Sequence, residues 1–178
     1  MLKKILGGFA AVIVLVLAFA AARPADYRVT RSAAMAAEPK AVWAQVNDFK
    51  NWGAWSPWAK LDPDAKNTIS EPAAGVGATF AWEGNSKVGA GKMTILDSKA
   101  GELVDIRLEF FKPMPGVSKT LLTFQPEGAG TRMTWDMSGT NNFVGKLMCL
   151  FMDMDKMVGG DFERGLASIK GIVEKPAK

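Results

Sequence analysis

The middle of the chain alternates between apolar and polar residues with a period of two, as β-strands do when they bury one face and expose the other. The clearest run is residues 102–111, whose apolar face consists of Val104, Ile106, Leu108 and Phe110. Turns rich in glycine or proline separate the runs. The pattern predicts antiparallel strands at residues 27–36, 77–83, 88–97, 102–111, 119–126 and 131–138.

The C-terminal segment changes to helical spacing. In residues 160–175 the apolar residues recur at intervals of three or four, which places them on one stripe of a helix. Asp161 is placed to cap the N-terminus of this helix, and Pro176 to stop it. A helix with one apolar face needs a partner, and the predicted sheet supplies one. The stripe consists of Phe162, Leu166, Ile169 and Val173, with Ile172 at its margin.

Two further helices are predicted before and after the strands. A short one begins near Pro39 and ends at residues 47–48. A longer one covers residues 142–158, and the pair Gly159-Gly160 separates it from the last helix. Its apolar face is formed by Phe143, Leu147, Leu150, Phe151 and Met154, and further methionines widen that face.

Residues 5–22 carry no charge and have no polar face, so a buried helix of a soluble domain is a poor explanation for them. Their length favours an uncleaved membrane anchor, while small residues near Ala20 also resemble a signal-peptidase site. We therefore expect residues 1–25 to be a transmembrane anchor or signal segment and residues 26–178 to form one domain. With Lys3 and Lys4 on the first flank, the domain is expected to face outward.

Charge and composition exclude several function classes. Without residues 1–25 the chain keeps 19 of its 22 basic residues against 18 acidic ones, and these are interspersed. A nucleic-acid partner is therefore not expected. The chain has no histidine, and its single cysteine, Cys149, lies among apolar residues. These facts argue against His-dependent nucleophilic catalysis, and we predict no metal or other cofactor. Glu83, Asp97, Asp136 and Asp155 near element ends are interpreted as solvated surface groups.

Three of the six tryptophans, Trp52, Trp55 and Trp58, lie within the segment NWGAWSPW at residues 51–58. Gly53 and Pro57 prevent a regular helix there. Each indole can bury about 150 to 250 Å² and needs an acceptor for its N–H group. The segment is thus expected to fold inward, either as a plug at one end of the sheet or as a wall of a ligand cavity.

The order of these elements resembles a known architecture. A strand and a helix precede NWGAWSPW; five strands and two helices follow, and the segment MDKMVGGDFERGL lies at residues 154–166. This arrangement over residues 27–174 resembles the START-like helix-grip superfamily, in its SRPBCC or polyketide cyclase/dehydrase-like branch, and the two segments resemble a bacterial subgroup that is often membrane-tethered. The resemblance implies an α+β fold in which a curved antiparallel sheet wraps around a long C-terminal helix and encloses an apolar cavity. Members bind or transport lipids, sterols and polyketides, and some catalyse cyclisation or dehydration.

We therefore expect binding or transport of a hydrophobic small molecule or lipid by a domain tethered to the membrane through residues 1–22. The location implied is the bacterial inner membrane with the domain on its outer side, or secretion after signal cleavage. The inward-facing strand residues are almost all apolar, which disfavours an enzyme. The predicted ligand-binding residues are Trp52, Trp55, Trp58, Phe80, Trp82, Ile106, Leu108, Phe110, Leu122, Trp135, Phe143, Leu147 and Phe151.

Two alternatives remain open. A cyclase or dehydratase would place a buried carboxylate or Tyr27, the only tyrosine, in the cavity with a strongly shifted pKa. A protein-interaction module would have a filled core and an exposed apolar patch near Met114 or on the methionine-rich helix.

Overall fold

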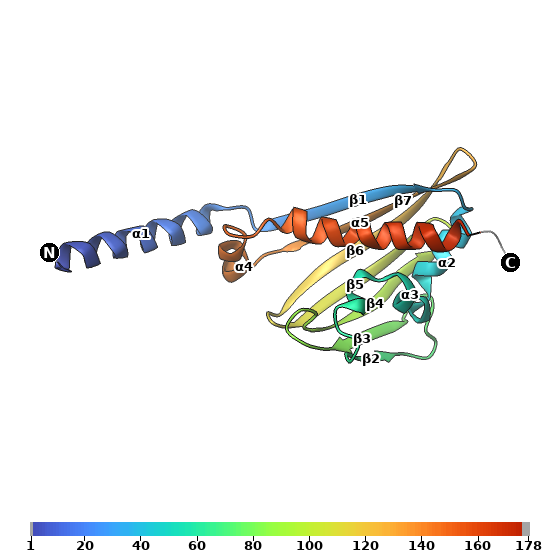
Figure 1. Ribbon diagram of the computed structural model, residues 1–178, viewed down its shortest axis with the longest axis horizontal. Helices are drawn as coiled ribbons and strands as arrows, with labels where there is room; N and C mark the ends of the chain where they lie inside the picture. The colour runs from blue at the N-terminus through green and yellow to red at the C-terminus, as the bar shows by residue number, and fades with distance from the viewer. Residues whose placement is uncertain (1, 176–178) are drawn as a thin grey trace.

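The computed structural model describes residues 2–175 and shows a curved sheet with one long helix along its concave side (Figure 1). A second, isolated helix projects from one end. The elements are α1 (Leu2–Ala22), β1 (Asp26–Met35), α2 (Pro39–Asn47), the 3-10 helix η1 (Phe49–Asn51), α3 (Trp52–Trp55), the 3-10 helix η2 (Pro57–Lys60), β2 (Lys66–Ile69), β3 (Thr79–Glu83), β4 (Ala90–Lys99), β5 (Leu103–Lys112), β6 (Gly116–Glu127), β7 (Gly130–Thr140), α4 (Phe143–Met148) and α5 (Met154–Val173).

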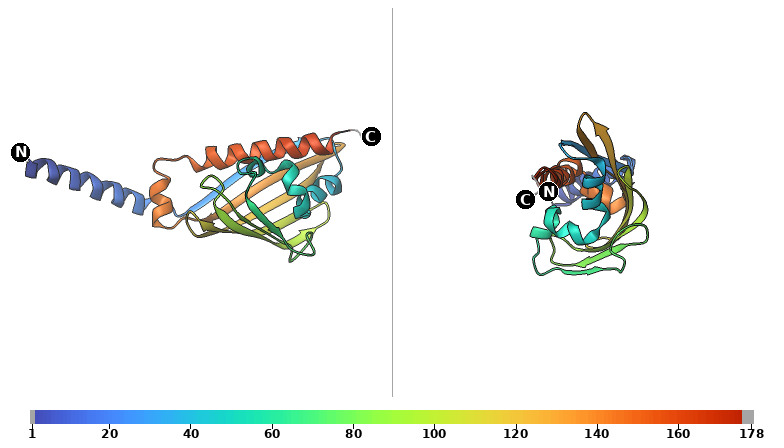
Figure 2. Two further views of the ribbon diagram at one scale, coloured as in Figure 1. Left: turned by 60° about the horizontal axis from the view of Figure 1, so that its bottom comes forward. Right: turned by 90° about the vertical axis from the view of Figure 1, so that its right-hand side faces the viewer.

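The sheet is antiparallel throughout, with the strand order β1-β7-β6-β5-β4-β3-β2. β1, the first strand along the chain, pairs with β7, the last strand along the chain. The helix α5 packs chiefly over β1 (Figure 2). The predicted alternation holds, because Val104, Ile106 and Leu122 on the inner face are fully buried. The predicted α+β fold, with a curved sheet and a long C-terminal helix, is confirmed.

The apolar stripe of the last helix is also confirmed. Phe162, Leu166 and Ile169 are buried in the main core, and Ile172 and Val173 pack against it. The opposite residues, among them Glu163 and Arg164, are exposed, so the helix has the amphipathic character that its spacing predicts.

The start of that helix differs from the prediction. α5 begins at Met154 and runs through Gly159 and Gly160 without a break, and its N-cap is Asp153, which accepts a hydrogen bond from the Lys156 amide. Asp161 lies inside the helix and pairs with Arg164. The glycine at position 159 does not break the helix; it leaves room for a contact with β1, because a side chain there would collide with the guanidinium of Arg31. The predicted stop, Pro176, lies outside the described residues.

The preceding helix is shorter than predicted. α4 ends at Met148, and a turn carries the chain to Asp153. The 142–158 helix is therefore wrong as a single element, because the chain must reverse here to bring α5 back along the sheet. The sequence pattern also missed β2, a four-residue edge strand without apolar alternation that pairs only with β3.

At the opposite end of the chain, α1 is almost entirely exposed and contacts α4 near its C-terminus. Within residues 2–175, Lys4–Ala22 is the one segment long and apolar enough to cross a membrane, and a signal sequence has the same properties. Near the C-terminus of α1, where this helix contacts α4, Ala20 is buried.

Candidate ligand-binding face

Five apolar residues on the inner face of β3, β4 and β5 are only half-buried. They lie in two adjacent cross-strand rows, since Phe80 pairs with Met93 and Met93 with Leu108, while Gly91 stands between Trp82 and Phe110. Because α5 packs over β1 at the far side of the sheet, it leaves these strands less covered. We call this set the inner strip: Phe80, Trp82, Met93, Leu108 and Phe110.

Aromatic contacts join the inner strip to the core. Phe110 meets Trp82 edge-on with ring centroids 6.2 Å apart, Trp82 stacks on Phe80 at 6.3 Å, and Phe80 approaches Phe49 at 5.8 Å. Gly91 is needed beneath Trp82, because a Cβ at that position would overlap the indole ring. Gly91 therefore seats an aromatic ring of the strip.

The tryptophan segment closes the end of the sheet at which α2 lies. Trp52 Nε1 donates to the Val46 carbonyl oxygen over 2.8 Å, and Trp55 Nε1 donates to the Gln45 carbonyl oxygen over 3.0 Å. These carbonyls belong to the last turn of α2, whose C-terminal acceptors need partners outside the helix. Trp52 and Trp55 are thereby buried core residues, which supports the plug and leaves Trp58, half-buried, as the member nearer the surface.

Trp135 on β7 connects the plug, the sheet and α5. Its ring stacks on Phe162 with centroids 4.3 Å apart and planes 8° from parallel, and it meets Trp55 and Trp58 edge-on at 5.7 and 6.0 Å. Gly165 of α5 makes room, because a Cβ there would lie 2.8 Å from the indole. This half of the inner face is thus filled by aromatic side chains.

Two polar atoms on the inner face have no hydrogen-bond partner among the described residues. They are Trp135 Nε1 and Thr120 Oγ1, and their residues are only 2% and 4% exposed. The side chains occupy diagonal positions on neighbouring strands, since Thr120 pairs with Met137 and Trp135 with Leu122. An unpaired buried polar group costs about 1 to 3 kcal/mol, so such groups call for an explanation.

The register places the inner strip at the end of the sheet from which α1 emerges. Phe110 pairs with Gly116 near the β5–β6 hairpin, and at the same end of the sheet Asp26 of β1 pairs with Thr140 of β7. α1 precedes Asp26 and α4 follows Thr140. We call this the open end, and the end covered by α2 and the tryptophan segment the closed end.

A family model described as polyketide cyclase / dehydrase and lipid transport matches residues 26–174. The chain belongs to this family. Solved structures show the same fold: a protein from Chromobacterium violaceum (17% identity, TM-score 0.61, covering 86% of this chain and 100% of that one) and one from Rhizobium loti (18%, 0.60, 80% and 96%). The di-domain ARO/CYC BexL of the BE-7585A biosynthetic pathway is similar over 88% of this chain and 53% of that one (13% identity, TM-score 0.62). No curated protein matches.

In this member of the family, the predicted site residues divide into three groups. Trp52, Trp55, Ile106, Leu122 and Trp135 are fully buried core residues, whereas Phe80, Trp82, Leu108 and Phe110 form most of the inner strip and Trp58 is half-buried beside Trp135. The helix residues lie apart from both groups. Phe143 of α4, the helix that contacts α1, is 46% exposed, and Phe151 in the turn after α4 is 79% exposed; Leu147 lies between them in the sequence.

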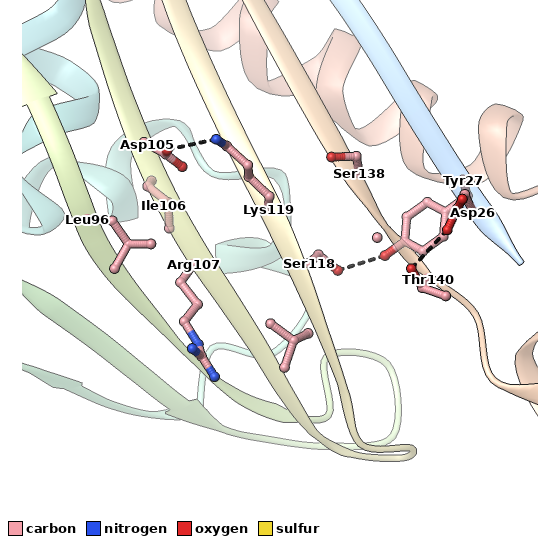
Figure 3. A pocket seen from close by; sticks show the side chains of 12 residues that line it. Asp26, Tyr27, Leu96, Asp105, Ile106, Arg107, Ser118, Lys119, Ser138 and Thr140 are labelled. Carbon is pink, nitrogen blue, oxygen red and sulfur yellow. Dashed lines mark hydrogen bonds and ion pairs between the residues drawn. The ribbon is translucent and has the colours of Figure 1, made fainter.

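A depression of about 570 Å³ lies on the outer face of the sheet. Figure 3 views it with α5 behind the strands, and its side chains include the Asp105 and Lys119 pair, 2.9 Å apart, and Arg107. The alternating charges of residues 102–111 therefore lie on the outer side and pair there, as the sequence indicates. This depression is separate from the inner strip.

Three of the four carboxylates near element ends, Glu83, Asp136 and Asp155, are held in ion pairs. Lys112, 2.8 Å from Glu83, lowers the pKa of that carboxyl, and a hydrogen bond from Arg31 lowers the pKa of Asp155. Asp136 accepts from Arg28 over 2.6 Å on the outer face. Groups with lowered pKa stay charged near neutrality and make poor general acids. One polar contact on the inner face is the Tyr27 Oη to Ser118 Oγ hydrogen bond, 2.7 Å.

Sequence reasoning did not single out Ser118, Thr120 or Arg31 as site or clamp residues. The signal was present, because all three are polar at positions that the alternation places inward. Arg31 joins β1 to α5: its Nε donates to Glu163 over 2.8 Å, and its Nη2 donates to the Asp155 carboxylate over 2.8 Å. Asp155 and Glu163, both within the segment MDKMVGGDFERGL, thus fasten the N-terminal part of α5 to β1.

Proposed function

We propose that the domain binds a hydrophobic small molecule, lipid-like in character, along the inner strip, entering from the open end. The observation that carries this proposal is the set of half-buried aromatic and aliphatic side chains on an otherwise covered inner face. Covering that surface is favourable by about 25 cal/mol per Å². The family description, which includes lipid transport, supports the same function.

The unpaired atoms of Thr120 and Trp135 are buried beyond the strip, so they would orient a ligand only when the side chains packed around them move aside. The Trp135 N–H can only donate, whereas the Thr120 hydroxyl can donate or accept. A ligand with one carbonyl or hydroxyl oxygen at the end of an apolar body would match them, because binding sites of this kind combine apolar walls with few polar groups. Ligands without any oxygen should then bind more weakly than ligands of equal size that carry one.

We further propose that α1 anchors the domain in a membrane with the domain on the outer side. The apolar length of Lys4–Ala22 and its lack of burial support an anchor over a core helix. The competing possibility is a signal sequence that is removed. Extraction of cell membranes at high pH should leave the full-length chain in the membrane pellet; recovery of a shorter, soluble chain would contradict the anchor.

Ligand binding is best tested by photo-crosslinking in the intact protein. The full chain in nanodiscs would be illuminated with a diazirine-labelled fatty acid, and the labelled peptides would be mapped by mass spectrometry. We expect labelling within residues 79–83 and 103–112, in addition to α1. If only α1 is labelled, binding at the inner strip is disproved.

Two neighbouring residues provide matched variants for that experiment. Phe110 faces inward in the strip, while Phe111 faces outward and is 55% exposed. Phe110→Arg should reduce labelling of the strip roughly tenfold, because binding would then desolvate a charge. Phe111→Arg places the same charge one residue away on the other face, and it should leave the labelling unchanged.

A second candidate is cyclisation or dehydration of a polyketide-like substrate. The observation that favours it is the hydrogen-bonded Tyr27–Ser118 pair on the inner face at the open end, together with the family description and the similarity in fold to BexL. A tyrosine hydroxyl can donate a proton to a developing alkoxide. Incubation with a poly-β-carbonyl thioester should then yield cyclised product faster than in buffer, and Tyr27→Phe should abolish the acceleration. Equal rates with and without protein would eliminate this candidate.

A further inference from the structure

An exposed apolar cluster covers α4 and the turn that follows it. Large apolar side chains are normally exposed singly on soluble surfaces, and a contiguous group marks an interaction site. Phe151, at 79%, is the most exposed of the large apolar residues in the cluster. We call the group the α4 patch: Phe143, Val144, Leu147, Met148, Phe151 and Met152.

The patch is held at a fixed position beside the end of α1. Lys146 of α4 donates from Nζ to the Ala21 carbonyl oxygen over 2.6 Å, and Ala20 is fully buried. The Asn142 side chain caps α4 by accepting from the Gly145 amide over 2.9 Å. The Lys146 hydrogen bond and the packing at Ala20 therefore hold α4 against the last turn of α1, and the Asn142 cap stabilises the start of α4 itself.

The length of α1 gives the depth of this position in a bilayer. The 19 residues of Lys4–Ala22 span about 28 Å at about 1.5 Å per residue, close to the hydrocarbon thickness of about 30 Å. Ala20 and Ala21 then lie where the helix leaves the hydrocarbon. Side chains held against them lie at the boundary between headgroups and acyl chains.

We propose that the α4 patch inserts into the membrane interface beside α1 as a second attachment of the domain to the bilayer. This inference rests on the proposed anchoring role of α1, and it identifies the occupant of the patch as the phospholipid interface. Two attachments would fix the orientation of the domain, with the open end and its inner strip toward the lipid. A single helix ending in a short connection would leave that orientation free.

The surrounding charges indicate which lipids are required. The basic residues near the patch are matched by acidic ones, and Lys146 is already bound to α1. A polybasic cluster that selects anionic lipids is therefore not formed here, and attachment should depend on apolar insertion. The charged residues in the segments that flank the patch are Arg23, Asp26, Lys146, Asp153, Asp155 and Lys156.

Site-specific fluorescence in the full chain tests the proposal. Cys149→Ser removes the native thiol, and the single replacements Phe151→Cys, Val14→Cys and Leu96→Cys then carry an environment-sensitive label. Val14 lies in the middle of α1, and Leu96 is 53% exposed on the outer face of the sheet. Each labelled protein would be reconstituted in phosphatidylcholine vesicles with nitroxides placed at shallow or deep positions of the acyl chain.

The expected result is a different depth for each label. At position 151 the shallow nitroxide should quench roughly half of the fluorescence, as expected for insertion of about 5 to 10 Å. Position 14 should respond to the deep nitroxide, and position 96 to neither. Exchange of a fraction of the lipid for phosphatidylglycerol should leave the quenching at 151 unchanged.

Other outcomes would overturn the proposal in distinguishable ways. Quenching at 14 combined with an unquenched, iodide-accessible label at 151 would disprove insertion of the patch while the anchor stands. Loss of quenching at both positions would disprove the anchor and the patch together. Neither readout involves a ligand, so failure of ligand binding at the inner strip would be seen separately in the crosslinking experiment.

Discussion

The two ends of the inner face use similar aromatic side chains in opposite ways. At the closed end, Trp52 and Trp55 have their N–H groups bound to carbonyls of α2 and their rings packed against neighbours. At the open end, the Trp82 N–H also donates a hydrogen bond, to the Val88 carbonyl oxygen over 2.9 Å. Trp82 and Phe110 nevertheless remain only half-buried. A hydrogen bond to the indole nitrogen therefore does not distinguish a core tryptophan from one in the proposed binding strip. The two kinds differ in how completely other side chains cover the ring.

α5 is also held differently along its length. From its middle toward the closed end, Phe162 stacks on Trp135, Gly165 allows close packing, and Lys170 donates to the Ala34 carbonyl oxygen. From the open end to the middle, Arg31 of β1 donates to Asp155 and Glu163. The first turns of α5 are thus fastened mainly by Arg31 and the later turns mainly by apolar packing, so the two parts are separately testable.

The largest expected effect is truncation at the closed end. Trp135→Ala should lower the free energy of unfolding by about 3 to 5 kcal/mol, because it leaves a cavity among packed aromatic rings. Trp82→Ala should cost only about 1 to 2 kcal/mol, since the half-exposed ring buries less area. Urea denaturation followed by circular dichroism measures both. Equal costs would show that the open end is packed as tightly as the closed one.

A smaller effect is expected from added methyl groups on α5. Gly165→Ala should destabilise by about 1 to 3 kcal/mol, because the new Cβ would press on the Trp135 ring. Gly171→Ala lies on the same helix with nothing within 4 Å, and it should instead stabilise by about 0.5 to 1 kcal/mol through helix propensity. The pair is compared by thermal unfolding, and a stabilising Gly165→Ala would contradict the packing described for Trp135.

The neighbouring glycines in the part of α5 fastened by Arg31 give a finer test. Gly160→Ala has space beside it and should gain about 0.5 to 1 kcal/mol from helix propensity. Gly159→Ala has the same propensity but displaces the Arg31 guanidinium, so it should gain less or lose stability. An equal gain in the two variants, measured in the same denaturant series, would mean that Arg31 can move away freely.

The smallest effect concerns pH. The hydrogen bond from Arg31 lowers the pKa of Asp155 below its ordinary value of 3.8. A carboxyl with a lowered pKa contributes stability that is present above the ordinary pKa and is lost as the pH falls through the lowered one. Acid should therefore loosen α5 near Asp155 first. Hydrogen exchange below pH 4 should show earlier opening at residues 154–160 than at 162–169, and Asp155→Asn should make that opening early at neutral pH as well and remove most of its pH dependence.

The faces of the sheet were predictable from sequence because antiparallel strands bury alternate residues. Val104, Ile106 and Leu122 are buried where the alternation placed them, and Asp105 and Arg107 lie on the outer side. The stripe of α5 was predictable for the same reason, with a helical period. Local spacing records which side of an element is covered.

The remaining features depend on partners distant in the sequence. The pair Gly159-Gly160 reads locally as a helix break, but the structure uses Gly159 to admit Arg31. The division of the aromatic residues into buried and half-exposed sets follows from α5 packing chiefly over β1, which no local pattern records. β2 escaped prediction because an edge strand of four mostly polar residues has no apolar face to reveal it.

The pairing of β1 with β7 has a consequence for biosynthesis. β1 follows α1 directly, yet its partner strand comes more than a hundred residues later at Asp26 and Thr140, and α5 later still. Contacts between such distant segments form slowly, and an unpaired strand edge is prone to aggregation. The first strand of the domain must therefore wait, beside the translocation channel if α1 is an anchor, until nearly the whole polypeptide has been made.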